Sequence, residues 1–102
     1  MCIRDSVGTG KSGRQDGPAK AATLKSPKHI AIDGMDRVII ADEANQLIRR
    51  YDPKSRTVTT LLGGGIGTPP IKLSRPHGVC VENGKLYVVD TGHNRILRIE
   101  SE

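Results

Sequence analysis

The chain is nearly free of aromatic side chains, with two Tyr, no Trp and no Phe among its 102 residues. A buried core must therefore be built from Ile, Leu, Val and Ala, and the bases of a nucleic acid would find few rings on which to stack. No apolar run approaches the roughly 20 residues that span a bilayer, so we expect no membrane partner. Two cysteines, Cys2 and Cys80, form no Cys-x-x-C motif, which excludes the usual zinc and redox spacings.

The charge and composition of the chain bear on its binding partners and on the size of its core. The net charge is +5, but Lys and Arg are scattered along the chain from Lys11 to Arg98. A nucleic-acid binder usually gathers them in one stripe, so we do not expect nucleic acid as a partner. Hydrophobic residues make up 35%, which predicts a small core, and 12 Gly with 6 Pro predict many turns.

The first six residues and the two cysteines each carry an expectation of their own. Residues 1–6, Met-Cys-Ile-Arg-Asp-Ser, look like a translated sequencing adaptor, so we do not expect them to be part of the fold. Cys80 alternates with Val79 and Val81, a strand pattern that predicts a buried or half-buried structural thiol. The sequence is also compatible with a disulfide between Cys2 and Cys80.

The main positive signal is an internal repeat. Residues 24–42 align with residues 73–90 at an offset of 49 that shrinks to 48 after one deletion. The aligned pairs are Pro27 with Pro76, Ile30 with Val79, Ile32 with Val81, Val38 with Leu86, Ile40 with Val88 and Asp42 with Asp90. A period in this range indicates a repeat architecture.

Within each copy, short β-branched runs predict strands separated by turns. In the first strand of the first copy, the alternation places Ile30 and Ile32 on the inward face. Pro18 could open one helical turn within residues 18–24. The predicted strands are 29–33, 37–41, 46–51 and 57–62 in the first copy, and 78–81, 85–89 and 94–99 in the second.

Four short strands repeated every 45–50 residues are typical of a β-propeller blade. We therefore predict an all-β partial propeller of four-stranded antiparallel blades. The expected organisation is an irregular segment with an inter-blade loop at 1–28, a full blade at 29–62, a linker at 63–76 and a blade at 77–102 that ends before its fourth strand. Blades are stabilised by their neighbours, so the isolated chain is expected to be poorly soluble or only marginally folded.

The repeat units resemble the NHL-repeat family. The resemblance rests on Ser26-Pro-Lys-His-Ile-Ala-Ile-Asp in the first copy, and on Arg75-Pro-His-Gly-Val and Leu86-Tyr-Val-Val-Asp-Thr-Gly-His-Asn-Arg-Ile-Leu-Arg-Ile in the second. It covers residues 7–100 and includes a long loop, Gly8 to Ala22, like the one that precedes a blade in many bacterial members. It implies a propeller, often of six blades, in which this chain is a bacterial fragment contacting neighbouring blades.

The two copies differ after their aspartates. Leu47 stands where the second copy has Arg95, so any role of that arginine is expected to be missing from the first blade. Asp42 and Asp90 are predicted to accept backbone N–H bonds, and Gly92 to adopt a backbone angle closed to other residues. The arginines of the third strands are predicted to lie on an outward face, where they are candidates for binding.

The favoured function is a binding or scaffold module for a protein or other ligand, presented on loops 8–28, 42–46, 63–76 and 90–94. The possible ligand-facing residues are Lys28, His77, His93 and Arg95. No catalytic or cofactor-binding set is predicted. Gly8-Thr-Gly-Lys-Ser lacks the first glycine of a phosphate loop, because that position holds Asp5, and no helix follows it.

Two alternatives remain open. The chain could be a piece of a propeller lyase or lactonase whose catalytic residues lie mostly outside it. Zinc or calcium is expected only in that case, with His77 as the metal candidate. The third reading is an RNA-binding NHL domain that uses its basic top face, as some animal relatives do.

Overall fold

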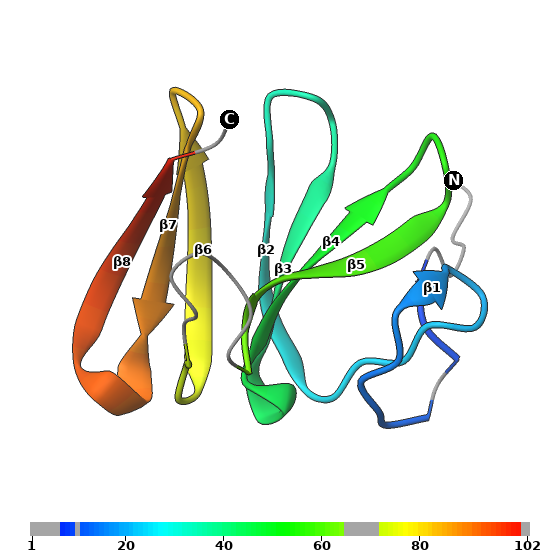
Figure 1. The fold of residues 1–102 in the computed structure, drawn as a ribbon, viewed down its shortest axis with the longest axis horizontal. Coiled ribbons are helices and arrows are strands. Elements are labelled where there is room, and N and C mark those ends of the chain that lie inside the picture. The colour runs from blue at the N-terminus through cyan, green and yellow to red at the C-terminus, as the bar shows by residue number, and fades with distance from the viewer. Residues whose placement is uncertain (1–6, 10, 65–71, 101–102) are drawn as a thin grey trace, which may run out of the picture.

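The structure is a computed structural model that describes residues 7–9, 11–64 and 72–100 of the chain. These residues form two antiparallel sheets that stand side by side (Figure 1). In the first sheet the strand order is β1-β5-β4-β3-β2, and in the second it is β6-β7-β8. The strands are β1 (Gly17–Pro18), β2 (Pro27–Ile32), β3 (Val38–Asp42), β4 (Leu47–Asp52), β5 (Thr57–Gly63), β6 (Pro76–Glu82), β7 (Lys85–Asp90) and β8 (Arg95–Glu100).

Aspartates build the tight turns between strands. The Asp33 carboxylate accepts the backbone N–H of Met35 at 2.8 Å and that of Arg37 at 2.9 Å, which closes the turn between β2 and β3. Asp52 accepts the N–H of Lys54 at 2.9 Å in the turn between β4 and β5. Short carboxylates stabilise turns in this way, so the two turns lie where the sequence predicted them.

The core lies between the two sheets. β2 and β6, the first strands of the two repeats, are neighbours there, and the N–H of Val79 donates to His29 Nδ1 at 3.3 Å. The buried cluster comprises Ile39, Ala41, Ile48, Leu62, Leu73, Val79, Leu86 and Val88. One face of the first repeat thus packs on the opposite face of the second. This is the packing of adjacent propeller blades, and the predicted all-β partial propeller is confirmed.

The predicted inward orientation of Ile30 and Ile32 is wrong. Their side chains are 58% and 54% exposed. Their repeat equivalents, Val79 and Val81, pack in the core, because the same sheet face meets a neighbour in the second repeat but not in the first. Alternation identified which residues share a face, but not which face is covered.

The N-terminal segment is more ordered than expected. The helical turn predicted within residues 18–24 is a single hydrogen-bonded turn, in which Ala21 and Ala22 donate to the Pro18 carbonyl at 2.9 and 2.8 Å. Just before it, Gly17 and Pro18 pair with Val58 and Thr57 at the outer edge of β5. A strand at this place was not predicted.

The prediction for Cys80 also fails. Its thiol is free and exposed on β6, on the face that points away from the first sheet. Cys2 and the rest of residues 1–6 lie outside the described residues. Within the described ranges, no helix has the length and apolar character needed to cross a membrane.

Candidate functional site

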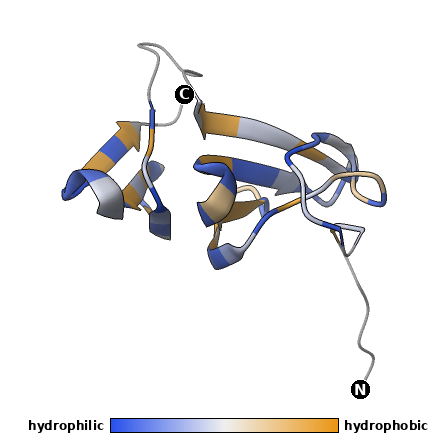
Figure 2. Cartoon of the chain, turned by 90° about the horizontal axis from the view of Figure 1, so that it is seen from below, coloured by the Kyte–Doolittle hydropathy of each residue, from blue (hydrophilic) through white to orange (hydrophobic). Residues whose placement is uncertain are grey.

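The candidate site is the end of the sheets at which β2 and β6 begin, here called the turn end. Two 3-10 turns, η1 (Glu43–Asn45) and η2 (Thr91–His93), follow β3 and β7 at this end. Viewed from this end, the turns and strand starts carry mostly hydrophilic colours (Figure 2). Loops 42–46 and 90–94 therefore lie together with the starts of the first strands.

Asp90 organises the turn end of the second sheet. One carboxylate oxygen accepts the Ser74 N–H at 2.7 Å. The other lies 2.7 Å from His93 Nδ1 and 2.8 Å from Arg95 Nε. Arg95 also donates to the Lys72 carbonyl at 2.9 Å, so the carboxylate and the guanidinium together fasten the incoming loop to the end of β7.

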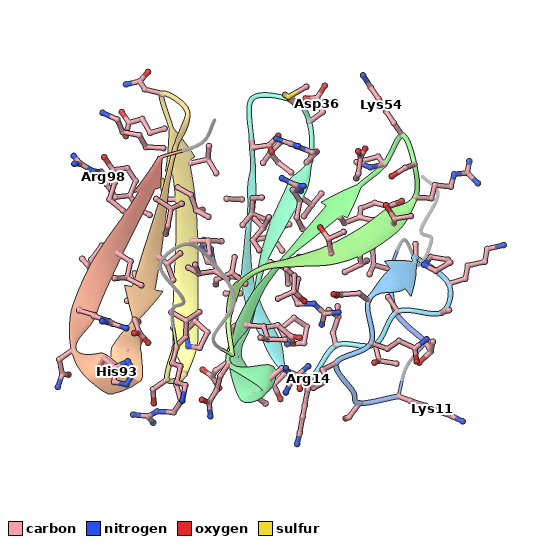
Figure 3. All side chains as sticks on the ribbon, viewed as in Figure 1. Lys11, Arg14, Asp36, Lys54, His93 and Arg98 are labelled. Carbon is pink, nitrogen blue, oxygen red and sulfur yellow. The ribbon has the colours of Figure 1, made fainter. Side chains whose placement is uncertain are left out.

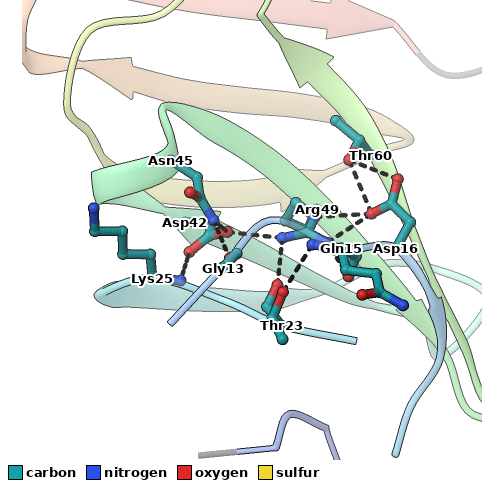
Figure 4. Close-up of polar contacts among 9 residues, drawn as sticks. All are labelled: Gly13, Gln15, Asp16, Thr23, Lys25, Asp42, Asn45, Arg49 and Thr60. Atoms are coloured by element: carbon teal, nitrogen blue, oxygen red, sulfur yellow. Dashed lines mark hydrogen bonds and ion pairs between the residues drawn. The ribbon is translucent and has the colours of Figure 1, made fainter. Parts of the chain in front are cut away.

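Asp42 does the same in the first sheet (Figure 4). Its Oδ1 accepts the Lys25 N–H at 2.7 Å, and its Oδ2 accepts bonds from Asn45 and Arg49, both at 2.8 Å. Arg49 also donates to the Thr23 carbonyl, the repeat equivalent of Lys72, at 3.0 Å. The prediction that both aspartates accept backbone N–H bonds is confirmed.

The sequence comparison suggested that the first blade has no counterpart of Arg95. That expectation is wrong, because Arg49 serves the same purpose. The two repeats read Leu47-Ile-Arg49 and Arg95-Ile-Leu97, so leucine and arginine have exchanged places two residues apart. Residues i and i+2 of a strand lie on the same face. Arg49 can therefore reach the Asp42 carboxylate although it lies two residues further along β4 than the position that matches Arg95. The signal was present in the sequence, but an alignment position by position hides it.

Arg49 is completely buried, which contradicts the predicted outward face. Its guanidinium uses five N–H donors in bonds to Asp42, Asp16 and two loop carbonyls. The bonds to Asp16 measure 2.6 and 3.1 Å, and the Thr60 hydroxyl donates to both oxygens of the same carboxylate. Arg49 is therefore a structural residue that holds the N-terminal strap (residues 11–25) on the first sheet.

Gly92 has a different role from the predicted one. It is not among the residues with positive φ, and a side chain at this position would instead collide with Ser74. The close approach lets the Gly92 N–H donate to the Ser74 carbonyl at 2.7 Å, whereas its equivalent Ala44 donates to Lys25 at 3.1 Å. In each turn the residue with left-handed backbone angles lies two positions later. It is Gln46 in the first repeat and Asn94 in the second.

The predicted ligand-facing residues have different surroundings. His93 and Arg95 converge on Asp90. His77 instead faces the first sheet, with its Nδ1 3.2 Å from Glu43 Oε2. Lys28 is exposed beside the start of β2. Two of the four residues thus have a clear structural task, and His77 links the two sheets.

The turn end is rich in cations without ion-pair partners among the described residues. These exposed side chains are Lys11, Arg14, Lys25, Lys28, Lys72 and Arg75. The acidic groups nearby, Asp42, Asp90 and Glu43, are already bonded. Figure 3 shows Lys11 and Arg14 at this end, and one acidic and one basic side chain, Asp36 and Lys54, at the other. The described part of the turn end therefore carries an excess of exposed positive charge.

The remaining chemistry is limited. Among the described residues, no group of three or more His, Cys, Asp or Glu is placed to hold a metal ion. At the opposite end, a hollow of about 620 Å³ opens between the sheets over Ile39, Leu62 and Leu86. Its floor belongs to the inter-blade core, and Arg50 and Lys85 lie at its wall.

We expect the chain to lose stability in acid through Asp90. Burial raises the pKa of this carboxyl, but bonds from the Ser74 N–H, His93 and Arg95 outweigh burial, and the pKa falls below its ordinary 3.8. The unfolded chain therefore binds the proton more readily. The contribution of Asp90 is complete above the unfolded pKa and is lost as the pH falls through the folded one. Urea unfolding at a series of acidic pH values should show a shallower loss for Asp90→Asn, and equal slopes would contradict the assignment.

Comparisons with known proteins agree with this geometry. The family profile described as NHL repeat matches residues 73–99. The chain is 33% identical over 109 residues to NHL repeat-containing protein 2 of Bos taurus, covering 97% of the chain and 15% of that protein. It is 30% identical over 97 residues to the Arabidopsis thaliana protein SUPPRESSOR OF QUENCHING 1, chloroplastic, covering 88% of the chain and 9% of that protein. The chain thus spans only a small part of these relatives.

Solved structures show the same fold. A Bacteroides thetaiotaomicron protein of unknown function superposes with a TM-score of 0.81 at 20% identity, over 90% of this chain and 26% of that one. An auxiliary nutrient binding protein from the same organism gives 0.69 at 19% identity, over 87% and 26%. A Bacteroides ovatus protein described in the same words gives 0.68 at 17% identity, over 88% and 27%.

Proposed function

This chain belongs to the NHL-repeat family, and from that premise we propose that it is part of a ligand-binding propeller whose turn end receives an acidic segment of a partner protein. The observation that carries the proposal is the gathering of cations without ion-pair partners at the turn end, next to acidic groups that are already bonded. Loops on a rigid sheet framework are the usual place for binding residues. Two structural neighbours described as auxiliary nutrient binding proteins support a binding role in general terms.

The composition of the surface favours carboxylates over nucleic acid. Single-stranded nucleic acids are held by aromatic stacking in addition to charge. The two tyrosines, Tyr51 and Tyr87, lie within β4 and β7 and not in the turns of this end. Lys28 and Arg75 flank the first residues of β2 and β6, where an extended acidic peptide can contact both repeats.

The test is fluorescence anisotropy with a labelled oligoglutamate peptide, with an oligolysine peptide and a single-stranded RNA as comparison probes. We expect the chain to bind oligoglutamate, and the affinity to fall with added salt because exposed charges are screened within about 10 Å at 0.1 M. Reversing two charges, Lys28→Glu with Arg75→Glu, should raise the dissociation constant about tenfold.

The matched control reverses two cations at the other end, Lys54→Glu with Arg56→Glu. This variant has the same net charge as the first one and should bind oligoglutamate like the unmodified chain. Equal weakening by both variants would show a net-charge effect and refute a site at the turn end. Preference for RNA over oligoglutamate would reject the acidic-segment proposal in favour of the RNA-binding reading.

A further inference from the structure

Two histidines of the second repeat share one arrangement at the turn end. His77 Nδ1 lies 3.2 Å from Glu43 Oε2, and His93 Nδ1 lies 2.7 Å from Asp90 Oδ2. Their side chains are 63% and 44% exposed. Each ring is thus held by a carboxylate through Nδ1, and neither Nε2 has a hydrogen-bond partner among the described residues.

The contact with a carboxylate decides what Nε2 can do. An ionised carboxylate only accepts hydrogen bonds, so Nδ1 carries the proton that joins each ring to its carboxylate. Burial raises the pKa of the Asp90 carboxyl, but the bonds that it accepts outweigh burial and keep the pKa below 3.8, so the group is ionised at neutral pH. In the neutral ring Nε2 is then an acceptor, and in the protonated ring it is a charged donor. A carboxylate on a ligand is repelled by the first form and bound by the second.

The first repeat has no titratable imidazole at either position. Lys28 is the equivalent of His77, and Asn45 is the equivalent of His93. Asn45 makes the same contact as His93, because its Nδ2 donates to Asp42 Oδ2 at 2.8 Å. An amide is therefore enough to hold the aspartate, and what the imidazole adds at this position is a charge that changes with pH.

Both positions stay open when a neighbouring blade is present. The first sheet has the second sheet packed on it, and there Lys28 is exposed and Asn45 is partly exposed. The second sheet has the first sheet packed on it, and there His77 and His93 are exposed. These side chains lie at the ends of the strands, and the contact between blades does not cover them.

The third histidine has the opposite arrangement. His29 Nδ1 accepts the N–H of Val79 at 3.3 Å, so its neutral ring carries the proton on Nε2, and it has no carboxylate partner within the described ranges. A proton on His77 or His93 is added to a surface that is already mostly cationic. The other charged groups around these two histidines, in the described part of the chain, are Glu43 of η1, Asp90 of β7, Arg95 of β8, Lys28 of β2, and Lys72 and Arg75 ahead of β6.

We propose that His77 and His93 make the turn end a proton-gated site, which binds the acidic segment when both rings are protonated and releases it as the pH rises. This inference rests on the acidic-segment site proposed above and adds its regulation. Histidine is the side chain whose charge changes between about pH 5 and pH 8. The glutamates of an acidic ligand stay ionised over the upper part of this range, so the change in affinity comes from the protein.

The experiment is the oligoglutamate anisotropy titration, made at about pH 6 and about pH 8. We expect the dissociation constant to be about tenfold higher at the higher pH, because two exposed charges are lost. The double variant His77→Lys with His93→Asn gives the second repeat the residues of the first, and its dissociation constant should change by less than about twofold. His29→Asn is the matched control and should keep most of the change.

A second measurement needs no variant. Nitrogen-15 NMR of the unmodified chain at the higher pH should show the Nδ1–H tautomer for His93, because Nδ1 donates to Asp90. Adding oligoglutamate near neutral pH should move the ring signals of His77 and His93 toward the protonated form, because binding and protonation favour each other.

The outcomes separate this inference from the proposed function. Equal affinity at both pH values, a double variant that keeps the change, loss of the change in His29→Asn, or the Nε2–H tautomer at His93 would each overturn the proton gate and leave the acidic-segment site in place. No binding of oligoglutamate at either pH would refute the site itself and the proton gate with it.

Discussion

Arg49→Met is expected to destabilise the chain by about 3–5 kcal/mol, because it removes one partner of a fully buried ion pair. The Asp42 carboxylate would keep its bonds to Lys25 and Asn45 but lose the opposite charge. The carbonyls of Gln15 and Thr23 would lose donors at the same time. A loss of this size is comparable with the whole stability of a small domain.

The effect should begin in the N-terminal strap. Arg49 joins this segment to the sheet through Asp16, Gln15 and Thr23, so its loss should release residues 11–25 before the sheets separate. Amide hydrogen exchange would detect this as faster exchange of the Thr23 N–H, which is bonded to the Gln15 carbonyl. Urea unfolding gives the free energy of unfolding.

Arg50→Met is the matched control. Arg50 is the next residue of β4, lies on the opposite face and makes no side-chain hydrogen bond or ion pair within the described ranges, so its replacement should change the stability by less than about 0.5 kcal/mol. Arg49→Lys should not restore the native value, because an ammonium offers three donors where the guanidinium uses five. Similar losses for Arg49→Met and Arg50→Met would contradict the structural role of Arg49.

The strand order could be predicted because local signals and the repeat agree. The seven long strands lie within two residues of their predicted bounds, since β-branched runs and turn-forming Asp, Gly and Pro alternate clearly in both copies. β1 was missed because Gly17 and Pro18 carry no strand propensity. Their pairing with β5 is accompanied by the bond of the Ala19 N–H to the Arg56 carbonyl, a contact that only the folded chain creates.

The candidate site could be predicted only in part. Aligning the two repeats shows which residues occupy equivalent positions, but it does not show which side chains interact. Asp42 and Asp90 were assigned correctly since they occupy one position in both copies. Arg49 and Arg95 serve equivalent carboxylates from positions that differ by two residues, so the comparison implied that one blade had no such arginine. Gly92 shows the same limit, because its neighbour Ser74 comes from a distant loop.

The second large effect is expected for Ile48→Ala, which should cost about 2–5 kcal/mol because it opens a cavity in the core between the sheets. Ile48 is fully buried and packs with residues of both blades. The same substitution at its repeat equivalent Ile96, which is 69% exposed, should cost less than about 0.5 kcal/mol. Ile48 and Ile96 are the same residue type at the same position of equivalent strands. The difference between the two losses of stability therefore measures the effect of burying the Ile48 face against the second sheet.

The comparison is made by urea unfolding in dilute solution, at two chain concentrations. Ile48→Ala should show its full loss at every concentration, because its neighbours belong to the same chain. Equal losses for the two variants in dilute solution would mean that the two sheets do not pack on each other as described.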